Sequence, residues 1–235
     1  MFYFDSTYLI ILPAFILALW ASARVNSTFK KYSRISCRSG FTGAMAARTV
    51  LDKNGLYNVR IEHIQGDLTD HYDPREEVIR LSDSVYNSTS AAAIGVACHE
   101  AGHAVQHAEN YIPIKIRSAL VPITGFGSQV GIWLFFIGFI LSSFSAAFAA
   151  LAYVGIFLFS FTALFQLVTL PTEFNASKRA LRAIHESGIL DSEAEKGAKK
   201  VLSAAALTYV AALAVSISQI IRLLVLIAGT RRRDD

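Results

Sequence analysis

Four apolar runs alternate with two polar segments along the chain. The first run, Tyr8–Ala23, precedes a basic stretch, and the next two, Leu120–Leu141 and Ala146–Leu170, are separated by a short break. A helical run of such length crosses about 30 Å of hydrocarbon. The fourth run, Val201–Gly229, is longer but contains Arg222, so its course is the hardest to predict. The pattern predicts a multi-span helical membrane protein.

The composition agrees with this pattern. Of the 235 residues, 53% are hydrophobic, and the mean hydropathy of +0.42 is too high for one soluble domain. The residues before the first run carry no basic side chain, and the run lacks a small-residue cleavage site. We therefore interpret Tyr8–Ala23 as an uncleaved first span and not as a signal peptide.

The first polar segment shows a second kind of periodicity. In Tyr57–Ile64 and Glu77–Leu81, β-branched residues alternate with polar ones, which predicts two strands of a small sheet. An edge strand of this sheet can pair with an extended peptide. The intervening Leu68–Pro74 has turn chemistry at its end. The side chains of Asp70, His71 and Asp73 allow two interpretations. One is a second metal site, and the simpler one is a solvated hairpin.

The pattern with the most specific chemistry is His99-Glu100-Ala101-Gly102-His103. On a helix, His99 and His103 share a face and can bind one cation, while Glu100 can hold the water that reacts. A zinc ion lowers the pKa of its bound water to about 7 and polarises a peptide carbonyl. The flanking residues are uncharged, as a buried helix requires. We expect the missing side chain of Gly102 to leave room for metal or substrate.

A zinc hydrolase needs three protein ligands and one open position. The two spans after the motif return the chain to the same membrane side, where Thr172 and Glu173 are the first polar residues. Leu170–Glu173 resembles a helix start, with Thr172 as N-cap, and the helix is expected to end near Ser187 before Gly188. We predict Glu173 as the third ligand, and the alternative is an ordinary helix-start carboxylate.

Two other residues near these patterns are weaker candidates for a role in the site. His107 repeats the four-residue spacing, but it lies about 12 Å along the helix from His99 and cannot share its ion. We expect His107 to be packed or hydrogen-bonded. Tyr209, in an alanine-rich segment, is either a donor to the oxyanion of the reaction or an aromatic anchor at the membrane interface. The sequence favours neither role.

Charge sets the expected orientation. Basic residues near the span ends place both polar segments in the cytoplasm and the N-terminus outside: Arg24, Lys30, Lys31, Lys115, Arg117, Lys178 and Arg179. The cluster Arg231–Arg233 would lie outside if the fourth run crossed fully, so the side of the C-terminus stays open. Cys37 and Cys98 form no disulfide framework, which suits a reducing compartment.

These boundaries divide the chain into five parts. We expect a first transmembrane span (1–23), a cytoplasmic region with the sheet and the motif helix (24–118), a transmembrane hairpin (119–170), a cytoplasmic helix with Glu173 (171–200), and a C-terminal hydrophobic helix with a basic tail (201–235).

Several motifs together resemble the YugP-type neutral zinc metallopeptidases of bacteria. The resemblance runs nearly end to end and rests on Phe2–Pro13, Ser39–Ala44, Leu68–Pro74, His99–His107, Leu167–Ser177 and Ala206–Val210. It implies an integral protein of the bacterial plasma membrane, with His99, His103 and Glu173 as zinc ligands and Glu100 as general base.

Glu173–Ser177 also resembles the Glu-(Phe/Tyr)-x-Ala-Asp motif of the HtpX and CAAX prenyl protease group. In that group the final aspartate is thought to orient a zinc-bound histidine. Here Ser177 takes its position. Asn175 lies about 200° round the helix from Glu173 and cannot simply replace it. The support of the ligands is therefore expected to be weaker or to come from elsewhere.

We thus expect a mainly α multi-pass membrane protein with a zincin-like, gluzincin-type cytoplasmic catalytic region and a small β-sheet. It would be an endopeptidase with one Zn²⁺, whose Glu100 assists attack by zinc-bound water on membrane or membrane-associated polypeptides. The expected partners are a peptide or protein substrate and the lipid bilayer, with no nucleic acid, and the oligomeric state stays open.

Two other readings remain. One is a peptidase of opposite topology that acts on exported chains, and the other is a non-proteolytic zinc-binding membrane scaffold or adaptor. A zinc transporter is disfavoured because Leu120–Leu141 and Ala146–Leu170 contain no ionisable residue that could form an ion path.

Overall fold

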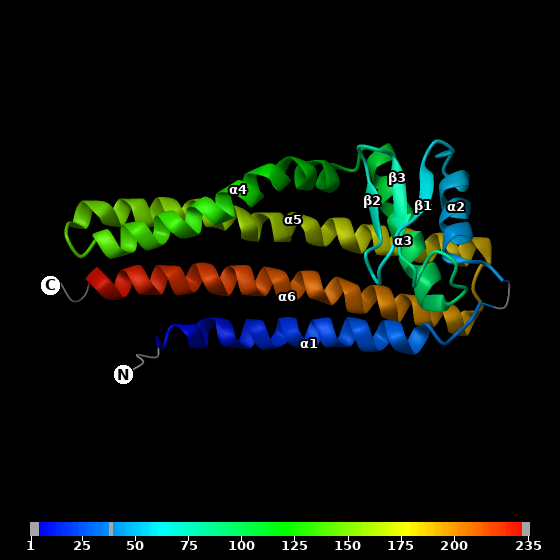
Figure 1. Cartoon of the computed structure of the whole chain (residues 1–235), viewed down its shortest axis with the longest axis horizontal. Helices are drawn as coiled ribbons and strands as arrows, with labels where there is room; N and C mark the ends of the chain where they lie inside the picture. Colours follow the sequence, from blue (N-terminus) through cyan, green and yellow to red (C-terminus); the bar gives the residue numbers. More distant parts are fainter. Residues whose placement is uncertain (1–4, 38–39, 232–235) are drawn as a thin grey trace. The chain divides into compact units, whose positions relative to one another are not determined.

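The computed structural model describes residues 5–37 and 40–231, which form mainly α-helices and one small sheet (Figure 1). The expected mainly helical class with a small sheet is confirmed. Contacts divide the chain into two compact units, each considered by itself below. Among the described residues, the first unit consists of the residues up to Trp20, of Ile116–Leu170, and of the residues from Thr208 onward. The second unit consists of Ala21–Lys115 and Pro171–Leu207.

Four helices in the described part of the chain are long and apolar enough to cross a membrane. They are α1 (Tyr8–Tyr32), α4 (Ile112–Leu141), α5 (Ala149–Ser187) and α6 (Ser192–Arg231). A short 3-10 helix, η1 (Ala146–Phe148), precedes α5. Three of the four predicted apolar runs fall within one of these helices, and the remaining run, Ala146–Leu170, begins in η1 and continues in α5. Each of the four helices extends beyond its run. Of the basic tail, Arg232 and Arg233 lie outside the described residues.

The predicted helix start before Glu173 is wrong. Helix α5 continues from Ala149 through Pro171 to Ser187, so Pro171 lies inside it. Proline lacks an N–H and favours a helix start, which is why the local pattern was misleading. In this chain the preceding apolar run is already helical, and membrane helices tolerate an internal proline. The predicted end is confirmed, because Gly188 follows Ser187 with a φ of 61°.

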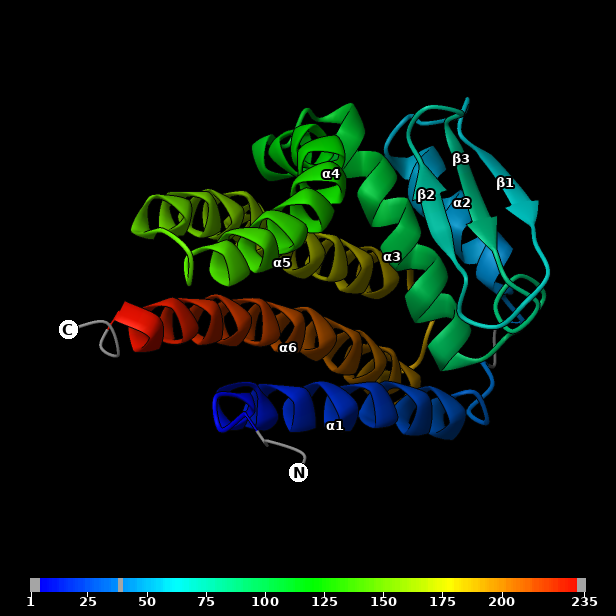
Figure 2. The ribbon, with the colours of Figure 1, turned by 60° about the vertical axis from the view of Figure 1, so that its left-hand side comes forward.

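In the first unit, glycines let α4 and α5 pack closely, and the two helices lie side by side in Figures 1 and 2. A Cβ on Gly138 would lie 2.4 Å from the backbone nitrogen of Ala152, and one on Gly155 would lie 2.4 Å from that of Phe135. A Cβ on Gly131 would lie 2.7 Å from the carbonyl oxygen of Gly155, at the same helix contact. Small residues at such positions allow helix backbones to approach without a hydrophobic driving force.

Arg222 links α6 to the start of α1 within the first unit. Its Nη2 donates to Asp5 Oδ2 at 3.0 Å and its Nε donates to Thr7 Oγ1 at 3.1 Å. The guanidinium lies 3.8 Å from the ring centroid of Tyr8, and the residue is 5% exposed. Asp5 also accepts the backbone N–H of Thr7 at 3.0 Å. The one charge in the last apolar run is therefore paired.

The second unit contains a three-stranded sheet in the order β1-β3-β2. Strand β1 (Arg60–His63) pairs parallel with β3 (Val78–Leu81), and β2 (His71–Asp73) pairs antiparallel with β3. The two predicted strands are confirmed, and β2 was mistaken for part of a turn. A three-residue strand with one apolar side chain, Tyr72, carries too little alternation to be recognised.

Two helices pack on this sheet and carry the core of the second unit (Figure 2). Helix α2 (Gly43–Lys53) contacts β1, and α3 (Ala91–Ala108) contacts α2, β2 and β3. Ser90 caps α3 by accepting the Ala93 N–H at 3.2 Å. Most of α3 is buried, as its uncharged sequence predicts.

The ion pair of Arg222 predicts an asymmetry between two substitutions. Asp5→Asn leaves a buried guanidinium without a counter-charge and should destabilise the protein by about 3 kcal/mol. Arg222→Met removes the buried charge itself and should cost less, about 1 kcal/mol, because the Asp5 side chain is 35% exposed and keeps Thr7. Thermal unfolding in detergent measures both. Equal losses, or a larger loss for Arg222→Met, would contradict the structural role of the pair.

Candidate metal centre

Three side chains from two helices converge in the second unit. The Nε2 atom of His99 lies 3.2 Å from Glu173 Oε2, and that of His103 lies 3.6 Å from the same oxygen. One ligand atom from each of the three residues falls within 4.8 Å of the other two. The two imidazole rings are nearly perpendicular, with centroids 4.7 Å apart. The three residues predicted as ligands are therefore brought together.

This donor set fits a zinc ion. Tetrahedral zinc with bonds of about 2.1 Å to nitrogen and oxygen separates its ligand atoms by about 3.4 Å. The two distances to Glu173 Oε2, 3.2 and 3.6 Å, bracket that separation. Two imidazoles and one carboxylate are also a ligand set of catalytic zinc sites, which keep a fourth position for water or substrate. No other group of three such side chains with metal-binding spacing occurs among the described residues.

Helix geometry explains how the ligands meet. His99 and His103 are one turn apart on α3, and Glu173 is on α5. Gly102 lies where the two helices cross, and a Cβ there would be 2.8 Å from the carbonyl oxygen of Ala176. The expectation that Gly102 makes room for metal or substrate is thus wrong. Its missing side chain makes room for the backbone of α5.

Burial shapes the electrostatics of the motif helix. Burial raises the pKa of Glu100, although the charges of His103 and His99 oppose this. For His103, burial lowers the pKa, but the hydrogen bond to Glu173 and the charge of Glu100 outweigh it, so the pKa is raised. Both shifts show carboxylates and imidazoles held close together away from water, as in a metal site.

Cys98, the residue before the first ligand, belongs to the apolar core of the unit. Burial raises the pKa of its thiol to about 12. Only a thiolate binds metal or reacts as a nucleophile, so this neutral thiol is a packing residue. Cys37 and Cys98 are not joined by a disulfide, and Cys37 Sγ donates to the Ile189 carbonyl at 2.8 Å.

Each imidazole has a polar partner on the nitrogen that faces away from Glu173. His99 Nδ1 lies 3.2 Å from Ser177 Oγ, so Ser177 takes the place that its sequence position suggested. His103 Nδ1 lies 3.0 Å from Gln106 Oε1. Gln106 is fully buried and donates its Nε2 to the Thr172 carbonyl at 2.8 Å and to Asn175 Oδ1 at 2.9 Å.

The part played by Gln106 and Asn175 was not found from the sequence. Gln106 does not enter the site predicted from the sequence, and Asn175 enters it only as a residue that cannot replace the aspartate. The available signal was the spacing: Gln106 follows His103 by three residues, and Asn175 follows Glu173 by two. That spacing becomes informative only when α3 and α5 are known to cross.

The other residues considered from the sequence lie elsewhere. His107 stacks near Tyr72 of β2, with ring centroids 5.6 Å apart, so its expected packing role is confirmed. Asp70 accepts hydrogen bonds from Ser82, and His71 bonds to the Thr69 carbonyl. Asp73 accepts from Arg75 and Arg80. The simpler interpretation of Asp70, His71 and Asp73, as parts of a solvated hairpin, therefore agrees with their contacts.

Tyr209 lies half-buried on α6 in the first unit, and its predicted role in the reaction stays a prediction. Glu100 is next to His99 on α3 and is half-buried. The charge of Glu100 raises the pKa of His103, and the charge of Glu173 raises the pKa of Glu100. Both effects indicate that the Glu100 carboxylate is electrostatically coupled to the ligand set.

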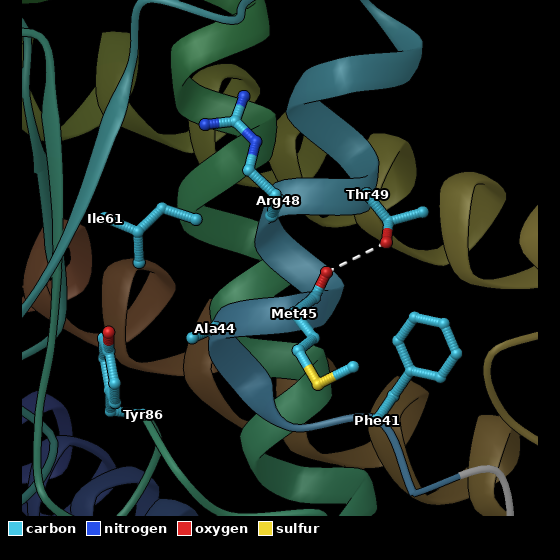
Figure 3. A pocket seen from close by; sticks show the side chains of 7 residues that line it. All are labelled: Phe41, Ala44, Met45, Arg48, Thr49, Ile61 and Tyr86. Carbon is cyan, nitrogen blue, oxygen red and sulfur yellow. Dashed lines mark hydrogen bonds between the residues drawn. The ribbon is translucent and has the colours of Figure 1, made fainter.

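A groove on the second unit, of about 430 Å³, is separate from these ligands (Figure 3). Its charged residue, Arg48, donates to the carbonyls of Val59 and Leu56 at 2.7 Å and pairs with Asp52 at 2.8 Å. It contains no carboxylate, imidazole or thiol among its lining residues, which are Phe41, Ala44, Met45, Arg48, Thr49, Ile61 and Tyr86. The groove therefore lacks the side chains that usually bind zinc.

Comparison with known proteins agrees with this donor set. The family described as "Putative neutral zinc metallopeptidase" matches residues 7–228. The "Putative membrane protease YugP" of Bacillus subtilis (strain 168) is 47% identical over 215 residues, which cover 92% of this chain and 93% of that protein. No solved structure matches the chain.

The crossing at Gly102 makes a testable prediction. Gly102→Ala gains about 1 kcal/mol of helix propensity, but overpacking against the Ala176 backbone costs about 1–3 kcal/mol and separates Glu173 from the histidines. We expect lower stability and reduced zinc retention, measured by thermal unfolding and by metal analysis after dialysis.

Gly95→Ala on the same helix is the matched control, because its Cβ would meet the Ala198 Cβ at a milder 3.1 Å. This variant should retain zinc. Full zinc retention by Gly102→Ala would show that the close approach is not needed for the ligand geometry.

Proposed function

Because this chain belongs to the family of neutral zinc metallopeptidases, we propose that it is a membrane-embedded endopeptidase of the gluzincin type, with one zinc ion held by His99, His103 and Glu173. The observation that carries the proposal is the convergence of two imidazoles from α3 and a carboxylate from α5 at ligand spacing. The long apolar helices and the similarity to a protein named as a membrane protease support the membrane assignment.

The chain's own residues supply the acid–base chemistry in this proposal. A bound zinc ion would polarise the scissile carbonyl and acidify water. Glu100 accepts a proton from the attacking water and delivers it to the amine that leaves. Its raised pKa makes it a stronger base in the first transfer than an exposed glutamate would be. Tyr209 is proposed as a donor to the oxyanion that forms on the carbonyl, with an interfacial anchor as the alternative.

We propose that the substrates are membrane or membrane-associated polypeptides. Glu173 follows the end of the third apolar run at Leu170 by three residues of one continuous helix, about 4.5 Å along its axis. In the second unit, strand β2 is an edge of the sheet and contacts α3. Such an edge can pair with an extended substrate through main-chain hydrogen bonds.

The topology proposal places the active site on the cytoplasmic side of the bacterial plasma membrane. It is supported by the basic residues that flank the apolar runs. The contact of Arg222 with Asp5 and Thr7 adds a point that the sequence left open. Helices α1 and α6 are both candidate spans, and the contact joins the residues just before α1 to the last part of α6. It therefore supports placing both chain ends on the same side of the membrane.

A zinc-binding scaffold is the second candidate function. The Glu173 contacts join α3 to α5, so a metal there would also hold the unit together. The scaffold predicts that Glu100 is dispensable, whereas the peptidase requires it. The two candidates therefore differ at one residue that is not a ligand.

The test is Glu100→Gln in the purified full-length protein, assayed with an unfolded protein and with a hydrophobic peptide. We expect zinc to be retained and cleavage to fall by at least about 100-fold, since a general base contributes that much or more. His103→Ala is the comparison that should lose zinc and activity together. Cleavage by Glu100→Gln at the wild-type rate would contradict the assigned role of Glu100.

The topology is tested with reporters fused to the N-terminus, to the C-terminus and within 24–118. One reporter is active only in the cytoplasm and the other only outside it. We expect the two ends to report the outside and the polar segment to report the cytoplasm. Opposite signals from the two ends would rule out the arrangement that the Asp5–Arg222 contact supports.

A further inference from the structure

A chain of hydrogen bonds leads from the exposed surface of the second unit to one buried ligand. It passes from Glu109 through Arg179, Asn175 and Gln106 to His103. We propose that Gln106 is a positioning residue that fixes the tautomer of His103, with the proton on Nδ1 and the Nε2 lone pair directed at the metal. Arg179 sets the orientation of Gln106 through Asn175. This inference rests on the proposed zinc site.

The direction of each bond follows from Arg179, because a guanidinium can only donate hydrogen bonds. Its Nε donates to Asn175 at 2.7 Å, so the atom of Asn175 at that contact is the amide oxygen. The Nη2 of Arg179 pairs with Glu109 at 2.6 Å, which holds the guanidinium in place. The amide orientation of Asn175 is thereby determined by chemistry.

The same reasoning determines Gln106. Its atom facing Asn175 Oδ1, at 2.9 Å, must be the donor Nε2. The backbone carbonyl of Thr172, which can only accept, contacts the same Nε2 at 2.8 Å and requires the same orientation independently. Both Nε2 protons are thus used, and Oε1 is left to face His103.

The consequence for His103 is that its Nδ1 must donate. Gln106 Oε1 lies 3.0 Å from Nδ1 and has no proton to give. A neutral imidazole with its proton on Nδ1 has its lone pair on Nε2, the atom that faces Glu173. Zinc binds that lone pair, and the hydrogen bond on the opposite nitrogen orients the ring and raises its basicity.

The partner of His99 does not impose the same constraint. Ser177 Oγ lies 3.2 Å from His99 Nδ1, and a hydroxyl can donate or accept. The tautomer of His99 is therefore not determined by this contact. The two imidazole ligands are supported unequally, and His103 has the more rigid support.

The test compares Gln106→Met with Gln106→Glu in the full-length protein in detergent. Gln106→Met has similar length but accepts no proton from Nδ1, so zinc affinity should fall by about 10- to 100-fold. Gln106→Glu keeps an oxygen that accepts from Nδ1, and its other oxygen, when protonated, donates to Asn175 Oδ1 or to the Thr172 carbonyl in place of Nε2. Its zinc affinity, measured by chelator competition, should stay within about threefold of wild type.

Thermal unfolding without metal separates positioning from simple cross-linking of the helices. Both variants lose at least one of the two bonds that Nε2 donates, to Thr172 and to Asn175, and both should be destabilised. If zinc affinity follows stability and falls equally in both, Gln106 only joins α3 to α5 and the proposal is overturned. Unchanged affinity in both variants overturns it as well, while the zinc site stands. A wild-type protein that binds no zinc refutes the proposed function itself.

A distant substitution keeps the test decisive if Gln106 variants fail to fold. Arg179 is partly exposed, and Arg179→Gln removes the obligate donor that orients Asn175. We expect zinc affinity to fall by about three- to tenfold, less than for Gln106→Met, because Thr172 still orients Gln106. Lys178→Gln, at an exposed neighbour on the same helix, is the charge-matched control and should bind zinc as wild type. An identical affinity for Arg179→Gln and this control would contradict the role of Arg179.

Discussion

The close crossing of α3 and α5 is the contact on which the candidate metal centre depends. It requires Gly102, where no side chain separates the motif helix from the backbone at Ala176. The crossing brings Glu173 to His99 and His103, Ser177 to His99, and Asn175 to Gln106. Helix packing and metal binding therefore use the same few turns of the two helices, and neither can change without affecting the other.

The long helices continue from the unit that holds this centre into a unit made of apolar helices, which packs differently. In the second unit, the sheet and α2 bury the apolar face of α3 in an ordinary hydrophobic core. In the first unit, glycine contacts between α4 and α5 and the ion pair of Arg222 accompany a smaller apolar cluster that includes Phe135 and Leu223. The same helices supply residues to both units. The chain thereby continues from apolar spans into a polar site without a linker.

Local sequence patterns predicted much of the structure because helix formation and side-chain spacing depend mainly on neighbouring residues. The apolar runs predicted the four long helices, and i, i+4 spacing predicted the pairing of His99 with His103. Glu173 was found by asking where the chain returns after two spans. The errors arose where a distant contact outweighs a local preference. Pro171 stays helical inside α5, β2 forms only beside β3, and Gly102 serves the approach of another helix.

The buried thiol of Cys98 bears on which ions the centre can select. A cysteine one residue before a histidine ligand would attract soft, thiophilic ions such as copper(I) or cadmium if it ionised beside the site. Its sulfur instead lies in the apolar core and stays protonated. The ligand set among the described residues is thus two nitrogens and one oxygen, a combination of borderline hardness. The packing of α3 in the core thus also keeps a sulfur atom out of the ligand set.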